Sequence, residues 1–209
     1  MKSYGQYCAL ARGLDVIGDR WTLLIVRELL AGPCRYSELL EGLPGIATNL
    51  LADRLRGLEK HGVVARDAQG RYQLTAWGQG LAEPVHAIAR WAAPLMAAPP
   101  GDNAFRSSWL ALPVAVIFDG TDPGRPPLTI EVRTGDTPLT IESRHGQVRV
   151  VPGPAMSPDL VLTGPPDGII GVLMGALDQA SAVSRGVTTH GDLRQLARLR
   201  KPPGSVRHR

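Results

Sequence analysis

The chain of 209 residues contains only two cysteines, Cys8 and Cys34. Two cysteines are too few for a disulfide framework, and neither belongs to a CxxC pair or a Cys/His cluster with zinc spacing. No apolar run approaches the roughly 20 residues needed to span a membrane. The N-terminal segment MKSYGQYCAL lacks the apolar core of a signal peptide. These absences predict a cytoplasmic protein with no membrane partner.

Recognisable catalytic motifs are also missing. The sequence has no G-x-S-x-G, no P-loop, no H-E-x-x-H and no Rossmann glycine pattern. Asp119 and Asp122 form a carboxylate pair, but they lie in a Gly/Pro turn where we expect them to be solvated. No two histidines have ligand spacing; they stand at positions 61, 86, 145, 190 and 208. We therefore expect no enzyme, no cofactor and no metal site.

Charge does not distinguish the two halves of the chain. The net charge is +4, and residues 1–100 carry 11 Lys/Arg and 9 Asp/Glu against 12 and 10 in residues 101–209. Each half is therefore +2. Only a local patch can indicate which half meets an acidic partner.

The first half has the pattern of a small helical domain. Apolar periodicity predicts helices over 8–17, 21–30, 36–40, 47–61 and 83–96. Gly32-Pro33 ends the second helix, and Pro44-Gly45 forms a tight turn before the fourth. VVARD and RYQLT, around Ala68-Gln69-Gly70, predict a β-hairpin. A short helix, a turn, a longer helix and a hairpin are the parts of a winged helix-turn-helix domain.

The helix over 47–61 is the candidate recognition helix. Leucines 51, 55 and 58 lie on one face, and polar residues 49, 53, 56 and 60 lie opposite. Taken alone, this pattern is that of any amphipathic surface helix. In a winged-helix context, however, its first turn would meet base edges, where Asn can bind adenine and Arg can bind guanine. The candidate DNA contacts are Arg35, Tyr36, Ser37, Thr48, Asn49, Asp53, Arg54, Arg56, Arg66 and Arg71.

Among these candidates, Arg66 and Arg71 flank the hairpin tip and could reach DNA backbone or minor groove, and Arg35 is placed for a phosphate. Asp53 is the exception, because a carboxylate near phosphates is unfavourable. It would have to accept a hydrogen bond from cytosine or pair with Arg54 or Arg56.

Residues 7 to about 97 resemble the HxlR family of bacterial winged-helix regulators, relatives of MarR. The resemblance is carried by IGDRWTLLIVREL, G-x-x-RYSEL, LPGIATNLLADRL and LTAWG, together with Cys8. It implies a homodimer, built from helices 8–17 and 83–96, that places paired recognition helices in successive major grooves of double-stranded DNA. Two departures stand out. The link from Arg66 to Tyr72 is short for a wing, and Ala47 stands where the recognition helix usually opens with Ser, so Thr48 caps the helix or one cap is missing.

Cys8 matches a cysteine that some family members use to sense oxidants or electrophiles. That role needs an accessible thiolate of low pKa. The alternative, which we favour from sequence, is a small buried residue near the dimer interface. Cys34 has no such counterpart, and we expect it to be inert.

The second half has a different pattern, and the break APPGDN (98–103) is the expected domain boundary. PLTIE occurs at 127–131 and again at 138–142, which predicts two successive strands; QVRVV and 159–163 predict two more, and 187–189 is extended. Helices are expected over 105–118, 168–184 and 192–199. A sheet with one apolar face needs helices to cover it. The predicted fold class is α+β: a winged-helix domain over 1–100, then a smaller α+β domain over 101–201 with a mostly antiparallel sheet. The basic tail, 202–209, is a disordered end or a phosphate-contacting arm.

The region from Pro158 to Leu199 resembles the end of a sterol carrier protein-type domain. Asp159 before a strand, Gly175 in a helix, and Gly186 before a strand ending in HGD carry this resemblance. It implies an apolar tunnel for a lipid-like ligand. The expected lining is Leu128, Ile130, Val132, Leu139, Ile141, Val148, Val150 and Leu173. The same residues would equally make a solid core without a cavity.

Three functions follow from the sequence. The first is a DNA-binding transcriptional regulator whose second domain binds an apolar effector. The second is an apolar-ligand carrier that uses the winged helix only to dimerise. The third is a redox sensor in which Cys8 supplies the signal.

Overall fold

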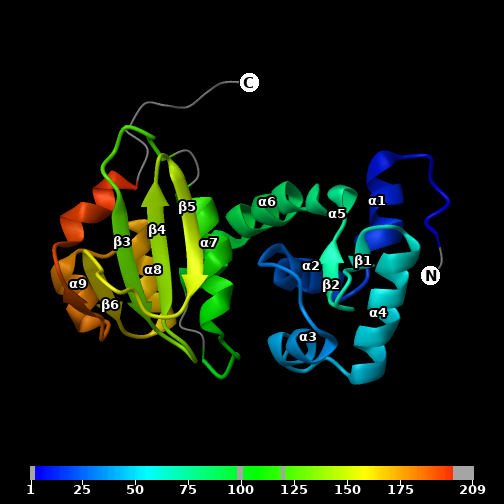
Figure 1. Cartoon of the computed structure of the whole chain (residues 1–209), viewed down its shortest axis with the longest axis horizontal. Coiled ribbons are helices and arrows are strands. Elements are labelled where there is room, and N and C mark those ends of the chain that lie inside the picture. The colour runs from blue at the N-terminus through cyan, green and yellow to red at the C-terminus, as the bar shows by residue number, and fades with distance from the viewer. Residues whose placement is uncertain (1–2, 98–100, 119–120, 200–209) are drawn as a thin grey trace. The chain divides into compact units, whose positions relative to one another are not determined.

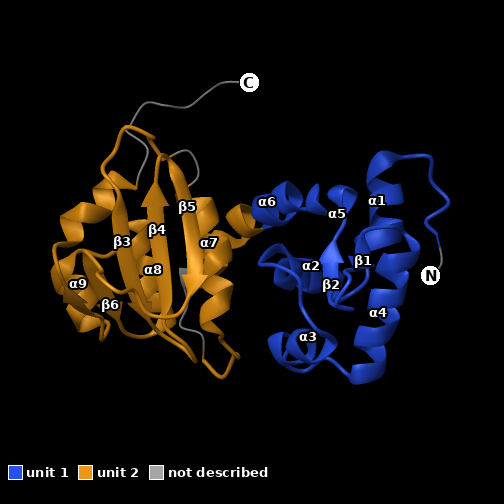
Figure 2. Ribbon diagram, viewed as in Figure 1, with its two compact units in different colours: residues 1–88 blue, residues 89–209 orange. Residues whose placement is uncertain are grey.

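The computed structural model describes residues 3–97, 101–118 and 121–199 (Figure 1). Contacts divide the chain into two compact units, unit 1 over 1–88 and unit 2 over 89–209 (Figure 2). The division falls inside a helix, α6 (Ala82–Ala92), rather than at the expected break at 98–103. Unit 2, expected to be the smaller, is the longer in sequence. Asp119, His208 and the basic tail 202–209 lie outside the described residues.

Unit 1 is a helical domain with a small hairpin. Its elements are α1 (Ala9–Ile17), α2 (Thr22–Leu30), α3 (Tyr36–Gly42), α4 (Thr48–Lys60), β1 (Val64–Arg66), β2 (Tyr72–Leu74), α5 (Ala76–Gln79) and the start of α6. The expected helices and hairpin are all present, with ends shifted by one or two residues except at the end of α6. One side of each of α2, α3 and α4 is buried through its apolar side chains: Ile25, Val26, Leu29, Leu39, Leu51, Leu55 and Leu58.

Two details of the elements up to Ala97 differ from expectation. Helix α5 was not expected; its start is capped by Thr75, whose side chain accepts a hydrogen bond from the Gly78 N–H at 3.0 Å. The expected helix 83–96 is α-helical only to Ala92 and continues as a 3-10 helix, η1 (Ala93–Ala97). Pro94 has no N–H to continue the α-helical hydrogen bonds, which accounts for the change.

Unit 2 is a five-stranded mixed sheet with strand order β5-β4-β3-β6-β7. Three neighbouring pairs are antiparallel and the β3–β6 pair is parallel. The strands are β3 (Leu128–Arg133), β4 (Leu139–Arg144), β5 (Gln147–Pro152), β6 (Leu160–Thr163) and β7 (Thr188–His190). The helices are η2 (Ser107–Leu110), α7 (Ala111–Ile117), α8 (Pro166–Met174), α9 (Gln179–Ser184) and η3 (Leu193–Arg198). In Figure 1, α7 and α8 lie behind the sheet and cover one of its faces.

The repeated PLTIE segments form the centre of this sheet. They pair as β3 and β4 with Ile130 opposite Ile141, so the two apolar faces coincide. His145 and Gly146, at φ 51° and 75°, make the tight turn from β4 to β5.

The helices of unit 2 are shorter than expected, because two of the predicted helices are each divided in two. The single helix expected over 168–184 is two helices, because Gly175 ends α8 in a left-handed conformation at φ 73°. Asp178 then caps α9 by accepting from the Ser181 N–H at 2.8 Å. The expected helix 105–118 is likewise split into η2 and α7, and the last helix is a 3-10 helix.

The residues expected to line an apolar tunnel belong to one hydrophobic core. Leu128, Ile130, Val132, Leu139, Ile141 and Leu173 are buried in it, and Val148 and Val150 are partly buried against it. They pack against side chains of α7 and α8, such as Val114 and Ile169. This is the arrangement expected of a solid core.

Candidate nucleic-acid interface

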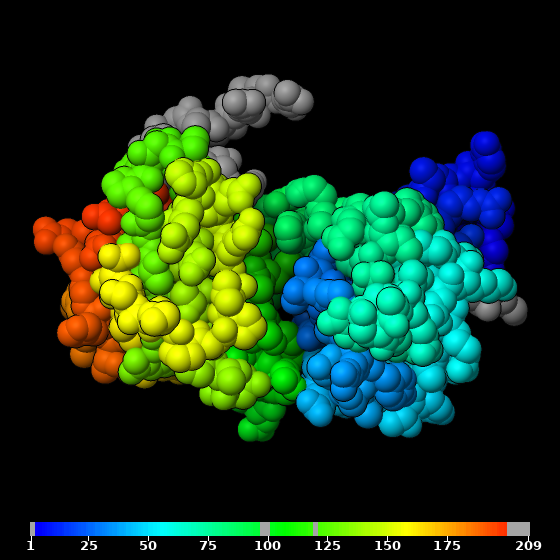
Figure 3. Space-filling model, in the orientation of Figure 1, coloured from blue at the N-terminus to red at the C-terminus, as the bar shows by residue number. Residues whose placement is uncertain are grey.

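Helix α4 has one packed face and one open face. Leu51, Leu55 and Leu58 are buried, whereas Asn49 and Arg56 are exposed. In the space-filling view, the segment from α3 to β2, coloured blue to turquoise, forms one exposed surface of unit 1 (Figure 3). The buried face fixes the helix on the domain, so its polar face is available to a partner.

The start of α4 has no side-chain cap. Ala47 occupies the cap position at φ −75° and ψ 143° and makes no side-chain hydrogen bond, so the cap that a serine would supply is missing. Asn49 Oδ1 accepts from the Leu50 N–H at 2.9 Å. Tyr36 donates its hydroxyl proton to the carbonyl oxygen of Thr48 at 2.6 Å. Tyr36, expected to contact DNA, therefore joins the start of α3 to the start of α4.

Asp53 pairs with Arg56 on the exposed face of α4, one of the two pairings that the sequence left open. Arg54 does not join this pair. Its guanidinium reaches the turn before α2, 2.9 Å from Asp19 Oδ2, and donates through Nε to the Arg20 carbonyl at 3.3 Å. The three charged candidates on α4 therefore all have partners within the chain.

The hairpin arginines are also engaged within the chain. Arg66 lies 3.2 Å from Glu59 of α4 and stacks over the Tyr72 ring at 4.4 Å. Arg71 pairs with Asp67 across the hairpin tip at 2.7 Å. The Arg66 contacts connect the hairpin to α4, and the Arg71 pair closes the hairpin tip. Either guanidinium can bind a phosphate only after its ion pair within the chain has opened.

Of the remaining candidates, Arg35, Ser37 and Thr48 are exposed. The backbone N–H of Arg35 donates to Glu38 Oε2 at 2.6 Å, which leaves its side chain outside the cap of α3. Because Tyr36 bonds to Thr48, the starts of α3 and α4 lie beside each other. The structure therefore brings Arg35, Ser37, Thr48 and Asn49 to one part of the surface.

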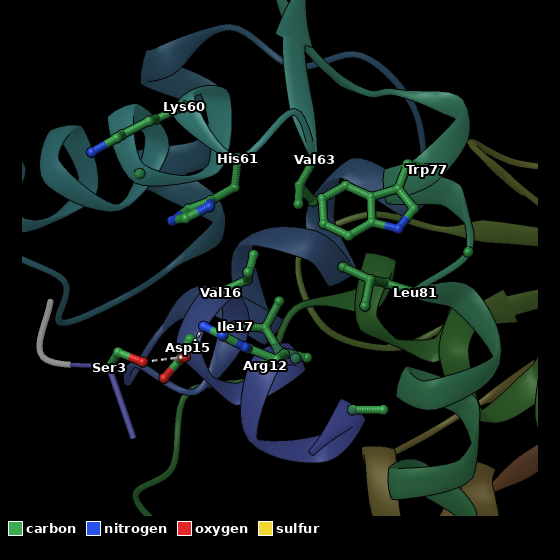
Figure 4. Close-up of a pocket in the computed structure, with 14 residues that line it drawn as sticks. Ser3, Arg12, Asp15, Val16, Ile17, Lys60, His61, Val63, Trp77 and Leu81 are labelled. Atoms are coloured by element: carbon green, nitrogen blue, oxygen red, sulfur yellow. Dashed lines mark hydrogen bonds and ion pairs between the residues drawn. The ribbon is translucent and has the colours of Figure 1, made fainter. Parts of the chain in front are cut away.

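A second surface feature of unit 1 is an open groove of about 1050 Å³. Figure 4 shows Lys60 and His61 on one side of it, Trp77 on the other, and Val16 and Ile17 of α1 below. Asp15, at its edge, accepts from the Ser3 hydroxyl and the Tyr4 N–H, and these bonds lower its pKa. The groove is mainly apolar.

Apolar side chains are exposed on α1 and α6. Leu10 is 71% exposed and Trp91 is 79% exposed. The others are Tyr7 and Leu14 near α1, and Ile88, Leu95 and Met96 on α6 and η1. Contiguous exposed apolar side chains on a helix typically mark an interaction surface.

The two cysteines have different environments. Cys8 is exposed at the start of α1, where the backbone N–H groups of Ala11 and Leu10 lower the pKa of its thiol. The expectation of a buried Cys8 is therefore wrong for the single chain, because the residue precedes α1 instead of packing under it. Cys34 is half-buried, and burial raises its pKa, which suits an inert thiol. The described residues hold no cluster of three potential metal ligands.

Comparison with known proteins bears on the first part of the chain. The model of the HxlR-like helix-turn-helix family matches residues 16–98. The HTH-type transcriptional regulator YvaP of Bacillus subtilis is 38% identical over 87 residues, which cover 39% of this chain and 81% of YvaP. The chain belongs to the HxlR-like helix-turn-helix family.

Two further similarities concern this HxlR-like segment. The regulator sll1512 of Synechocystis is 38% identical over 81 residues, and the match spans 36% of this chain and 60% of that relative. The crystal structure of quinone-bound YodB from Bacillus subtilis has 33% sequence identity and a TM-score of 0.38, and covers 41% of this chain and 96% of YodB. The family model covers residues 16–98, so the family relationship concerns this part of the chain, and the relatives named here are HTH-type transcriptional regulators.

Sequence patterns did not indicate that Asp19, Arg20 and Trp21 lie beside the candidate recognition helix and its entrance. They lie in GDRW, between two helices, and the contacts of Asp19 and Arg20 with Arg54 of α4 span more than thirty residues of sequence. The only signal available was the concentration of charged and aromatic residues in a short turn.

No helix among the described residues is long and apolar enough to cross a membrane.

Proposed function

We propose that this chain is a homodimeric transcriptional regulator that inserts the start of α4 into the DNA major groove. The observation that carries the proposal is the division of α4 into a fully packed leucine face and an exposed polar face whose first turn holds Thr48 and Asn49. Arg35 and Ser37 lie beside that first turn and are placed for phosphates. Asn49 is the residue best suited to read a base, because its amide can bond adenine in a bidentate manner.

Selection from a random-sequence duplex library tests this proposal. We expect the wild-type chain to enrich a two-fold symmetric duplex. Asn49→Ala should weaken binding to that duplex by about 1–3 kcal/mol while leaving non-specific binding almost unchanged. Gln147→Ala, which removes an exposed amide from β5, is the matched control and should bind as the wild type does. Failure to enrich any duplex, or equal loss in the two variants, would refute the proposal.

The homodimer is proposed from the apolar surface of α1 and α6. Leu10 and Leu14 of α1 and Ile88 of α6 are exposed apolar side chains that a second copy of the chain would cover. We expect a dimer in sedimentation at micromolar concentration. Leu10→Asp should yield a monomer, since it places a charge in the proposed interface. Met156→Asp, at a fully exposed position of unit 2, is the control that keeps the dimer.

Unit 2 is proposed to receive an apolar effector. A second groove, of about 450 Å³, runs beside α8, α9 and η3, and Val172 and Leu196 belong both to this groove and to the core. Its rim is polar, with Asp178, Asp192 and Arg194. An apolar chain could enter there by parting η3 from α8. We expect oleate to raise the unfolding temperature of the wild type, and to lose that effect in Leu196→Arg. Tight oleate binding by a chain that prefers no DNA sequence would favour a carrier instead.

Redox sensing is a second candidate because Cys8 is exposed and its pKa is lowered. A more populated thiolate reacts faster with oxidants and electrophiles. If Cys8 supplies the signal, hydrogen peroxide should alter DNA binding by the wild type but not by Cys8→Ser. Cys34→Ser should respond as the wild type does. An unchanged response in Cys8→Ser would exclude this role.

A further inference from the structure

The turn between α1 and α2 has an unusual backbone. Trp21 has φ 80° and ψ −21°, and among the described residues it shares a positive φ outside glycine only with His145. A side chain with a Cβ is disfavoured in this left-handed region, so surrounding contacts must hold it there. The Arg20 guanidinium lies 5.7 Å from the centre of the Trp21 ring.

The recognition helix is attached to this turn at its middle. The Arg54 guanidinium makes an ion pair with Asp19 at 2.9 Å and donates to the Arg20 carbonyl at 3.3 Å. The Arg54 side chain therefore binds both a carboxylate and a backbone carbonyl of the same turn. Arg54 and Asp19 are only 25% and 30% exposed, so the pair is partly shielded from water.

The Trp21 ring of the same turn lies near the segment that leads into α4. A Cβ built on Gly45 would lie 3.9 Å from Cη2 of Trp21, which is ordinary van der Waals contact. Gly45 itself has φ 88°, in the turn before Ala47 and α4. The observed attachment of the recognition helix to this turn is therefore the one made by Arg54 at the middle of α4.

We infer that Arg54 is a positioning residue, not a DNA contact: with Asp19 and the Arg20 carbonyl it clamps the recognition helix to the α1–α2 turn. The inference rests on the proposed function. Since α1 carries part of the proposed dimer surface, the clamp also connects α4 to the turn that directly follows this surface.

Two variants separate a clamp from a phosphate contact, because the two roles predict opposite results. If Arg54 met a phosphate, Asp19→Asn would remove a competing anion and tighten DNA binding. If Arg54 is a clamp, Asp19→Asn weakens binding about tenfold. For Arg54→Met, a lost phosphate contact would make the slope of log affinity against log salt shallower by about 0.9, whereas a lost clamp lowers affinity and leaves the slope unchanged.

The experiment is a salt titration of the full-length chain on the duplex obtained by selection, with thermal unfolding of each variant as a folding check. We expect Asp19→Asn, Arg54→Met and the double variant to bind equally weakly, since all three break the same clamp. Asp122→Asn, which removes a carboxylate from the exposed pair with Arg125, should bind as the wild type does. Tighter binding by Asp19→Asn, or a shallower slope for Arg54→Met, would overturn this inference alone. A wild type that selects no duplex would overturn the proposed function as well.

Discussion

Asp53 offers the most informative single change on the exposed face of α4. Its carboxylate pairs with Arg56, and the two side chains are 55% and 69% exposed. An ion pair so exposed contributes less than about 1 kcal/mol to folding. Asp53→Ala should therefore change the free energy of unfolding by less than about 1 kcal/mol, while removing an anion from the proposed DNA-facing surface and releasing the Arg56 guanidinium.

The expected effect on DNA binding follows from this release. One additional phosphate contact steepens the slope of log affinity against log salt by about 0.9, so raising salt fourfold costs the variant about 3.5-fold more affinity than the wild type. Fluorescence anisotropy with the selected duplex at 50 and 200 mM salt measures this difference. Adding Arg56→Ala to the Asp53→Ala variant should abolish it. Binding by Asp53→Ala that is tenfold weaker than wild type would refute the reasoning, and would mean that the carboxylate itself accepts a hydrogen bond from a base.

Three further changes test local packing and electrostatics. Gly78→Ala should destabilise the chain in urea by about 2–3 kcal/mol, because its Cβ would lie 2.1 Å from a backbone carbonyl oxygen; unchanged stability would contradict this contact. Tyr36→Phe should weaken specific DNA binding severalfold by freeing the Thr48 carbonyl from its 2.6 Å bond, and binding equal to wild type would show that this bond does not position α4. Asp136 accepts from the hydroxyl and N–H of Ser107, which lowers its pKa from 3.8 to about 2. Its ionised form therefore stabilises the fold above about pH 4, and this contribution is lost as the pH falls through about 2. Asp136→Asn should thus be less stable than wild type at pH 7, with the gap closing between pH 4 and 2; a gap of constant size would contradict the assignment.

Local patterns predicted the candidate interface where local forces determine the structure. Leucines at 51, 55 and 58 repeat with helical spacing, and Pro44-Gly45 and Gly62 bound the helix, so α4 and its packed face could be foreseen. The PLTIE repeat likewise predicted the central hairpin of unit 2, because alternation of apolar side chains fixes which face is buried.

The ionic partners could not be predicted in the same way. Arg54 was assigned to DNA because it lies on a helix with other cations, but its partner Asp19 is brought to it only by the packing of α4 against the α1–α2 turn. Arg66 was also placed near DNA, whereas Glu59 and Tyr72 hold it. The ion-pair partners of long charged side chains depend on how the helices pack against one another. The spacing of residues in the sequence therefore does not determine these contacts.

The positions at which helices end inside an apolar segment could not be predicted from the sequence either. Gly175 is tolerated inside a helix at some energetic cost, so the continuous apolar pattern from 168 to 184 favoured a single helix. The structure instead uses Gly175 in a left-handed conformation to end α8, and Asp178 starts α9. Both residues are common at helix ends, and only the observed fold distinguishes that use from an interior glycine and a surface aspartate.

Methylation interference on the selected duplex tests the central claim most directly, because methyl groups on guanine N7 occupy the major groove. A dimer that reads DNA with two α4 helices predicts two clusters of interference about ten base pairs apart, one helical turn, and Asn49→Ala should alter the base preference within both. A single cluster, or interference confined to adenine N3 in the minor groove, would contradict the account.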